Sequence, residues 1–229
     1  MSKYELTDET RQVAGHTLHR IRAVRDIGTY VNKGDIGGWI ESEKNLSQDG
    51  DCWVSGEACV YGNARVYGNA VVNGCAVVCG NAHVGDDAWV FGSAKVYGSA
   101  CVYGDARAFD FASVCGSARV FDYARVYGSA EVWVGAVWGR AEICGDARIG
   151  GTADYTVIRN SWSSGSWITY TRSNRMWNVG CFYGTGEQLI EKAYKDGDIK
   201  GKCYEAIVRA VEQVGDEAIM AEEKKEKNG

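Results

Sequence analysis

The chain has 229 residues, 45% of them apolar, which is enough for one elongated body with small end pieces. A net charge of −5 and a pI near 5.3 argue against a general nucleic-acid binder. The chain opens without a basic-then-apolar signal, and no stretch approaches the length of a membrane span. We therefore expect a cytoplasmic protein with no membrane contact.

Residues 1–47 show no regular period and contain two candidate strands. Tyr4–Leu6 and Thr17–Val24 have the composition of short strands, with a turn between them at Ala14-Gly15. An uncovered end of a stacked β structure would leave a row of backbone groups unpaired. We therefore expect this segment to cap the repeat that follows.

Residues 48–156 carry a six-residue repeat that reads V-x-G-x-A-x. Val opens each unit from Val54 to Val132 except at Ala108, and Ala stands four residues further on, through Ala136. The third position is usually Gly; the exceptions are Asp86, Asp110, Asp122 and Val134. In A-x-V, the Ala and the Val point to the same side of a short strand, while Gly or Asp suits a corner with an unusual backbone angle. Such short units must stack on one another, and three units per turn predict a triangular parallel β-solenoid.

These hexads resemble those of hexapeptide-repeat proteins, whose coils form a triangular left-handed parallel β-helix. The left-handed winding is implied by the resemblance, because crossovers between parallel strands are otherwise right-handed. The repeat loses its step between Val134 and Arg140, where Ala141 follows Ala136 by five residues instead of six. We expect a shortened corner or an irregular coil there.

A group of short segments lies between Ile21 and the start of the repeat: Ala23-Val24-Arg25-Asp26, Lys33-Gly34-Asp35, Gly37-Gly38-Trp39-Ile40, Asn45-Leu46-Ser47-Gln48 and Gly50-Asp51-Cys52-Trp53. Together they resemble the opening of a group of bacterial and phage hexapeptide-repeat proteins. That group includes an uncharacterised protein of enteric bacteria assigned as an acetyltransferase.

Residues 157–215 depart from the repeat and predict a small α/β module, followed by a charged, flexible tail at 216–229. The predicted elements are strands at Thr156–Asn160 and Trp167–Arg172 and helices at Thr185–Tyr194 and Lys202–Val214. The segment Trp177-Asn178-Val179-Gly180-Cys181-Phe182-Tyr183-Gly184-Thr185, with the helices after it, resembles the C-terminal module of phage-encoded β-helix proteins.

The residues on either side of each Val are predicted to point outwards and to stack with every third hexad. One face then carries an apolar set, which consists of Trp53, Trp89, Phe91, Phe109 and Tyr127. We interpret this set as the interface of a homo-oligomer, with a trimer favoured by analogy with the resembled family. Alternatively, stacked aromatic rings reinforce the solenoid itself.

Tryptophan and arginine concentrate in the C-terminal module, outside the periodic framework. The predicted binding residues are Trp162, Trp167, Tyr170, Arg172, Arg175 and Trp177. Aromatic rings beside guanidinium groups suit a planar anionic ligand or a protein partner. Alternatively, the tryptophans form the core of the module.

An enzymatic interpretation depends on His83, which precedes Val84 and is predicted to point outwards. The resemblance implies an acyltransferase that uses acyl-CoA, with His83 as general base. No carboxylate lies on the same strand to orient the ring, and the coils lack a long loop that could form an acceptor pocket. His16 and His19 lack a third ligand nearby, and the scattered cysteines show no metal-ligand spacing. We therefore expect no metal and no cofactor.

These observations favour a non-catalytic phage or prophage β-helix protein over the acyltransferase. We expect it to inhibit a host defence, either by sequestering a nucleotide-like signal or by binding a defence protein in the host cytoplasm.

Overall fold

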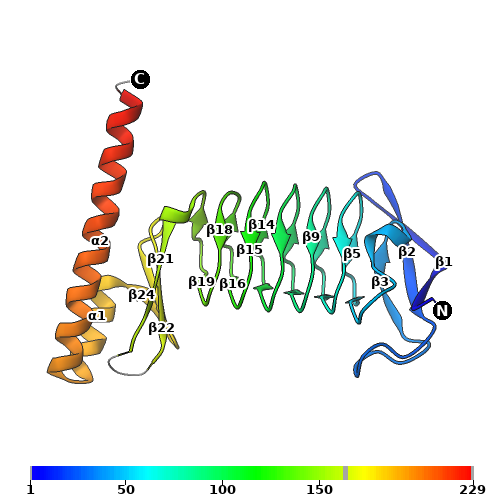
Figure 1. Ribbon diagram of the computed structural model, residues 1–229, viewed down its shortest axis with the longest axis horizontal. Coiled ribbons are helices and arrows are strands. Elements are labelled where there is room, and N and C mark those ends of the chain that lie inside the picture. The colour runs from blue at the N-terminus through cyan, green and yellow to red at the C-terminus, as the bar shows by residue number, and fades with distance from the viewer. Residues whose placement is uncertain (1, 162–164, 228–229) are drawn as a thin grey trace. The chain divides into compact units, whose positions relative to one another are not determined.

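The computed structural model describes residues 2–161 and 165–227 and divides into two compact units, Met1–Thr152 and Ala153–Gly229 (Figure 1). The first unit is a left-handed parallel β-solenoid of about six turns, as the repeat and the resemblance predicted. The second combines an antiparallel sheet with two helices. Among the described residues, no helix combines the length and apolar character needed to cross a bilayer.

Three parallel sheets form the faces of the solenoid. The first face contains β3 (Ile36–Ile40), β5 (Cys59–Val60), β8 (Val77–Val78), β11 (Lys95–Val96), β14 (Ser113–Val114), β17 (Glu131–Val132) and β20 (Arg148–Ile149). The second contains β4 (Trp53–Val54), β7 (Val71–Val72), β10 (Trp89–Val90), β13 (Arg107–Ala108), β16 (Arg125–Val126) and β19 (Glu142–Ile143). The third contains β6 (Arg65–Val66), β9 (His83–Val84), β12 (Cys101–Val102), β15 (Arg119–Val120) and β18 (Ala136–Val137).

Alternation along each two-residue strand separates the interior from the surface. Ala94 and Val96 are fully buried, whereas Lys95 between them is exposed. Backbone hydrogen bonds join each coil to the next, as from the Lys95 N–H to the Ala112 carbonyl at 2.9 Å. The corners take positive φ values, such as +71° at Gly98 and +54° at Asp86, which explains why Gly and Asp share this position.

The irregular coil lies at the corner between β17 and β18. Ala136 pairs with Arg119, an outward position, while the Gly135 carbonyl accepts the Arg119 N–H at 2.9 Å. The deletion therefore shortens this corner, and Gly135, which is only partly buried, takes the hydrogen-bonding position that a fully buried Ala fills in regular coils. The prediction that Ala136 continues the inward Ala series is wrong, because the register has already shifted by one residue.

Before the repeat, β1 (Tyr4–Val13) and β2 (His16–Ala23) form an antiparallel hairpin. Ala14 and Gly15 make its turn, with φ values of +50° and +85°. β2 pairs with β3, which in turn pairs in parallel with β5, so the first face of the solenoid continues into the hairpin. A short 3-10 helix, η1 (Glu43–Asn45), follows β3.

In the second unit, β21 (Tyr155–Arg159), β22 (Trp167–Thr171), β23 (Met176–Val179) and β24 (Phe182–Thr185) form the sheet, followed by α1 (Gly186–Lys195) and α2 (Asp198–Lys227). The sequence pattern predicted the first two strands and both helices but not β23 and β24. Thr185 caps α1 by accepting the Gln188 N–H at 3.4 Å. α2 continues through Lys227, well past Val214, where the predicted second helix ended.

The core of this unit lies between the sheet and the helices. Its buried residues are Ile168, Tyr170, Trp177, Leu189, Ile190, Ala193, Tyr204 and Val208. Within the core the Tyr170 and Trp177 rings pack with centroids 4.8 Å apart.

Candidate functional site

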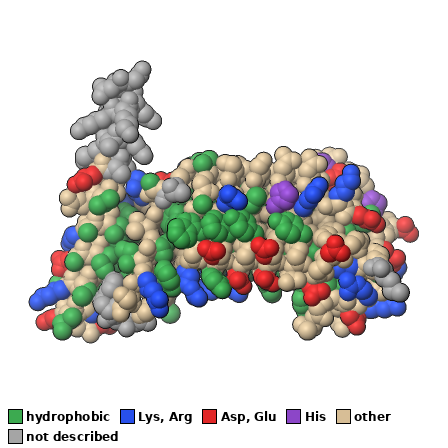
Figure 2. All heavy atoms as spheres, in the orientation of Figure 1, with side chains coloured by type: hydrophobic (Ala, Val, Ile, Leu, Met, Phe, Trp, Pro, Cys, Tyr) green, Lys and Arg blue, Asp and Glu red, His purple; other side chains and the backbone are tan. Residues whose placement is uncertain are grey.

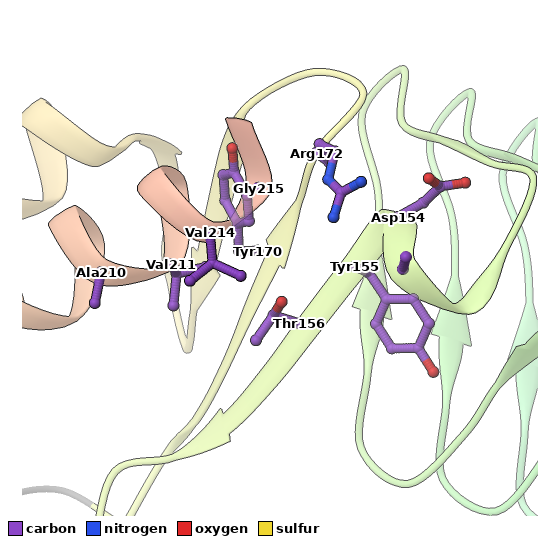
Figure 3. Close-up of a pocket in the computed structure, with 10 residues that line it drawn as sticks. Asp154, Tyr155, Thr156, Tyr170, Arg172, Ala210, Val211, Val214 and Gly215 are labelled. Carbon is purple, nitrogen blue, oxygen red and sulfur yellow. The ribbon is translucent and has the colours of Figure 1, made fainter. Parts of the chain in front are cut away.

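A pocket of about 220 Å³ opens in the C-terminal unit between β21, β22 and α2 (Figure 3). Its lining consists of Ala153, Asp154, Tyr155, Thr156, Tyr170, Arg172, Ala210, Val211, Val214 and Gly215. Most of the side chains are apolar or small, and among these residues Arg172 is the only cation and Asp154 the only acid. The pocket is therefore a mainly apolar space with one guanidinium group and one carboxylate at its wall.

The sheet register and the helix period bring these residues together. Tyr170 lies in β22 and pairs with Thr156 of β21, and Arg172 is the residue directly after β22. On α2, Val211 and Val214 are three apart and share one side of the helix. A Cβ atom added at Gly215 would lie 3.6 Å from the Nε of Arg172, an ordinary contact, so the arginine lies directly beside the helix.

Arg172 keeps its charge available to a ligand. Among the described residues, its guanidinium group makes no ion pair and no side-chain hydrogen bond. Its backbone is bonded on both sides, since the N–H donates to the Asp154 carbonyl at 2.8 Å and the carbonyl accepts the Arg175 N–H at 3.2 Å. Figure 3 shows the Arg172 guanidinium and the Asp154 carboxylate pointing in different directions.

The Tyr170 phenol is a second polar group of the pocket. Burial has the largest effect on its pKa and the nearby Glu212 carboxylate the next largest; both raise it, so the phenol stays protonated at neutral pH.

The other residues predicted for this site do not line the pocket. Arg175 is bound by Asp216, with nitrogen–oxygen distances of 3.1 and 3.3 Å. Trp177 is 0% exposed, and its indole N–H donates to Glu212 at 2.9 Å. The assignment of Trp177 to a ligand surface is therefore wrong, because β23 turns this ring into the core.

Trp167 and Trp162 complete the predicted set. Trp167 is 38% exposed at the start of β22, and the Arg159 guanidinium lies 6.0 Å from its ring centroid. Trp162 lies outside the described residues. Of the six predicted residues, the structure thus brings Tyr170 and Arg172 into one pocket, although Tyr170 is itself largely buried in the core.

The residues that complete the pocket were not among the predicted site residues. Tyr155 and Thr156 lie in the first strand, and only its pairing with β22 places them near Tyr170. Val211 belongs to the apolar side of the predicted second helix, and Val214 closes that helix in the prediction. Their spacing signals a buried helix face but not which part of that face remains open.

The alternative catalytic residue, His83, lies on β9 in the first unit and points outwards as predicted. Its ring meets the Tyr67 ring edge-on, with centroids 6.3 Å apart. Within residues 2–161 and 165–227, no carboxylate forms an ion pair or hydrogen bond with the His83 ring. Nothing in these contacts orients the ring as a general base would need.

The predicted interface ladder is present in part. Phe91, Phe109 and Tyr127 stack along the second face with centroids 4.9 and 4.8 Å apart and nearly parallel planes. Trp89 is 45% exposed beside them. Figure 2 shows hydrophobic side chains gathered in rows along the visible side of the solenoid.

Trp53, by contrast, is only 3% exposed. Tyr4 of the hairpin meets its ring edge-on, and a Cβ atom added at Gly37 would lie 2.7 Å from that ring. Trp53 is therefore covered by residues that precede the repeat. Its assignment to an oligomer interface is wrong.

The fold defines the class of this protein as a left-handed parallel β-helix with a C-terminal α/β unit. No protein-family model matches the chain, and no curated protein shows a significant sequence match to it.

Proposed function

We propose that this protein is a non-catalytic binding protein and that its C-terminal pocket holds a small planar ligand with an acidic group. The observation that carries the proposal is the Arg172 guanidinium, which has no ionic partner among the described residues and stands at the wall of an apolar pocket. A guanidinium group binds planar anions through paired hydrogen bonds and also stacks on flat rings.

The size and lining of the pocket restrict the ligand. About 220 Å³ is less than a typical pocket for a whole drug-sized molecule, so the enclosed part is about one ring system. Val211 and Val214 offer an apolar wall, and the Tyr170 phenol can donate a hydrogen bond. A nucleotide meets these requirements, with its base in the pocket and its phosphate on Arg172.

The acyltransferase alternative is less well supported by the contacts around His83. Its nearest described ring partner is Tyr67, and no carboxylate orients the imidazole. Acyl-CoA would also need a long cleft, whereas the hollow beside His83 is lined by six residues: Lys44, Ser47, Arg65, Val66, Tyr67 and His83.

The biological setting of the proposal comes from the resemblances noted in the sequence. We place the protein among phage or prophage β-helix proteins that blunt a host defence, acting in the host cytoplasm as a homo-oligomer. Removal of a nucleotide-like signal fits the pocket chemistry, and binding of a defence protein is the second form of the same role.

Titration calorimetry with cyclic AMP, a ring-bearing phosphodiester, and native mass spectrometry of gently purified protein test the proposal. We expect a nucleotide-type ligand to bind or to be carried, and Arg172→Ala to weaken binding about tenfold or more, since a hydrogen bond to a charged group is lost. Arg209→Ala is the matched control, because Arg209 lies on α2 but is paired with Glu187 away from the pocket. Loss of binding in both variants, or in neither, would contradict the assignment of the site.

A further inference from the structure

A second hollow, of about 440 Å³, lies on the third face of the solenoid, near its N-terminal end. The residues that line it are Lys44, Ser47, Arg65, Val66, Tyr67 and His83. They come from η1, the segment after it, β6, the residue that follows β6, and β9. This hollow lies in the first unit and has no residue in common with the C-terminal pocket.

Two anchors hold the segment around η1 against β6. The Asn45 side chain is fully buried and donates from Nδ2 to the carbonyls of Gly62, at 3.0 Å, and Ala64, at 2.9 Å. The Ser47 N–H donates to the Val66 carbonyl at 2.9 Å. Lys44 and Ser47 are therefore held beside the first full coil.

A glycine in the next coil shapes the wall of the hollow. Ser47, Tyr67 and Gly85 follow one another along the outward ladder of this face. A Cβ atom added at Gly85 would lie 2.3 Å from the Tyr67 ring, so this ring leans over Gly85 and occupies the place of the missing side chain. The small Ser47 side chain leaves the space on the other side of Tyr67 open.

Two cationic side chains, Lys44 and Arg65, line the hollow. Arg65 and His83 are neighbours in the parallel register, and Lys44 adds an ammonium group beside them. Within the described parts of the chain, none of these three side chains forms an ion pair, and no acidic residue lines the hollow. A bound anion would stabilise Lys44 and Arg65, two cations that line one hollow without an acidic residue in its lining.

Neutral donors accompany the charges. Burial, followed by the Asp86 carboxylate, raises the pKa of Tyr67, so its phenol keeps its proton at neutral pH. The Asp86 carboxylate itself accepts the Gly104 N–H at 3.1 Å. The Ser47 hydroxyl accepts the Asp49 N–H at 3.0 Å, which leaves its own O–H to donate.

We propose that this hollow is a binding site for a phosphomonoester group of a small molecule. Lys44 and Arg65 supply the charge, while Ser47, Tyr67 and His83 can add hydrogen bonds to the remaining phosphate oxygens. The volume is within the range of small-molecule sites and leaves room for an organic group beyond the phosphate.

Glycerol 3-phosphate, which has no ring, is the probe, in calorimetric titrations at neutral pH and low ionic strength. We expect it to bind the full chain, more weakly as salt is added, while glycerol does not bind. Replacement of Lys44 and Arg65 by Gln should weaken binding at least about tenfold. Arg107→Gln is the matched control, because Arg107 occupies the same outward strand position on the second face.

A second variant tests the shape of the hollow. Gly85 does not need a positive φ, so Gly85→Ala is compatible with the backbone but pushes the Tyr67 ring back toward Ser47 and into the hollow. We expect it to weaken glycerol 3-phosphate binding with little change in melting temperature. No binding to the unmodified protein, or equal weakening by Arg107→Gln, would overturn the proposal.

The two proposed binding sites can be tested independently of each other. Arg172→Ala should leave glycerol 3-phosphate binding unchanged, and the Lys44 and Arg65 replacements should leave cyclic AMP binding unchanged. If the unmodified protein binds only one of the two probes, the site assigned to the probe that does not bind is wrong.

Discussion

The carboxylate of Asp86 accepts a hydrogen bond of 3.1 Å from the backbone N–H of Gly104, one coil further along the solenoid. The Gly104 carbonyl in turn accepts the Asp87 N–H at 3.0 Å. The other two corners with aspartate repeat the arrangement, from Gly128 to Asp110 at 3.2 Å and from Gly139 to Asp122 at 3.1 Å. Aspartate at a corner therefore does more than tolerate the positive φ, because its side chain also joins successive coils.

This arrangement predicts an order of stability among variants of Asp86. Asp86→Ala loses the hydrogen bond and places a Cβ-bearing residue without a polar side chain at a φ of +54°. We expect a loss of about 1–3 kcal/mol in the free energy of unfolding. Asp86→Gly should cost less, because glycine accepts this φ, and Asp86→Asn least, because its amide oxygen can still accept the N–H. Urea denaturation followed by circular dichroism measures the order, and equal losses in the Ala and Asn variants would exclude a role for the hydrogen bond.

The exposed ladder on the second face predicts the assembly state. Trp89 is exposed and Phe91 stacks on Phe109, so replacing Trp89 by Lys and Phe91 by Glu places charges on an apolar surface without entering the core. We expect the unmodified protein to be an oligomer and this variant to be a monomer that keeps the β-rich circular dichroism spectrum. Sedimentation velocity provides the measurement, with Lys95→Glu on the first face as control. If the unmodified protein is already monomeric at micromolar concentration, the aromatic stack stabilises the solenoid alone.

The hairpin before the repeat predicts a dependence of stability on pH. Hydrogen bonds hold the pKa of Glu57 below its ordinary value of 4.5; the one from Arg20 has the larger effect, and the one from the Trp39 indole comes second. A carboxylate with a lowered folded-state pKa stabilises the fold above the unfolded-state pKa, and this contribution is lost as the pH falls through the folded-state value. Glu57→Gln should therefore lower the melting temperature slightly at pH 7, and the difference from the unmodified protein should shrink below about pH 4.5. A difference that stays constant from pH 7 to pH 3 would show that packing, not charge, explains the effect.

The sequence by itself determined the solenoid. Each hexad contains its own strand and corner, and stacking identical units requires no long-range information beyond the period, so Val96 inside, Lys95 outside and Gly98 at the corner could all be predicted. The break in the six-residue period also predicted the irregular corner near Val134. It did not show that Ala136 moves to an outward position, because that depends on pairing with Arg119 in the preceding coil.

Only the tertiary structure decided which surface residues are available to a ligand. Tryptophan and arginine residues such as Trp177 and Arg172 are found both in cores and in binding sites, so composition does not distinguish the two. In the structure, β23 buries the Trp177 indole, whereas the Arg172 guanidinium lies at a pocket wall. The basic hollow has the same origin, since Lys44 and His83 are far apart in sequence and meet because η1 is held against β6. Periodic packing is encoded residue by residue, whereas a site on such a fold depends on contacts between segments that share no local pattern.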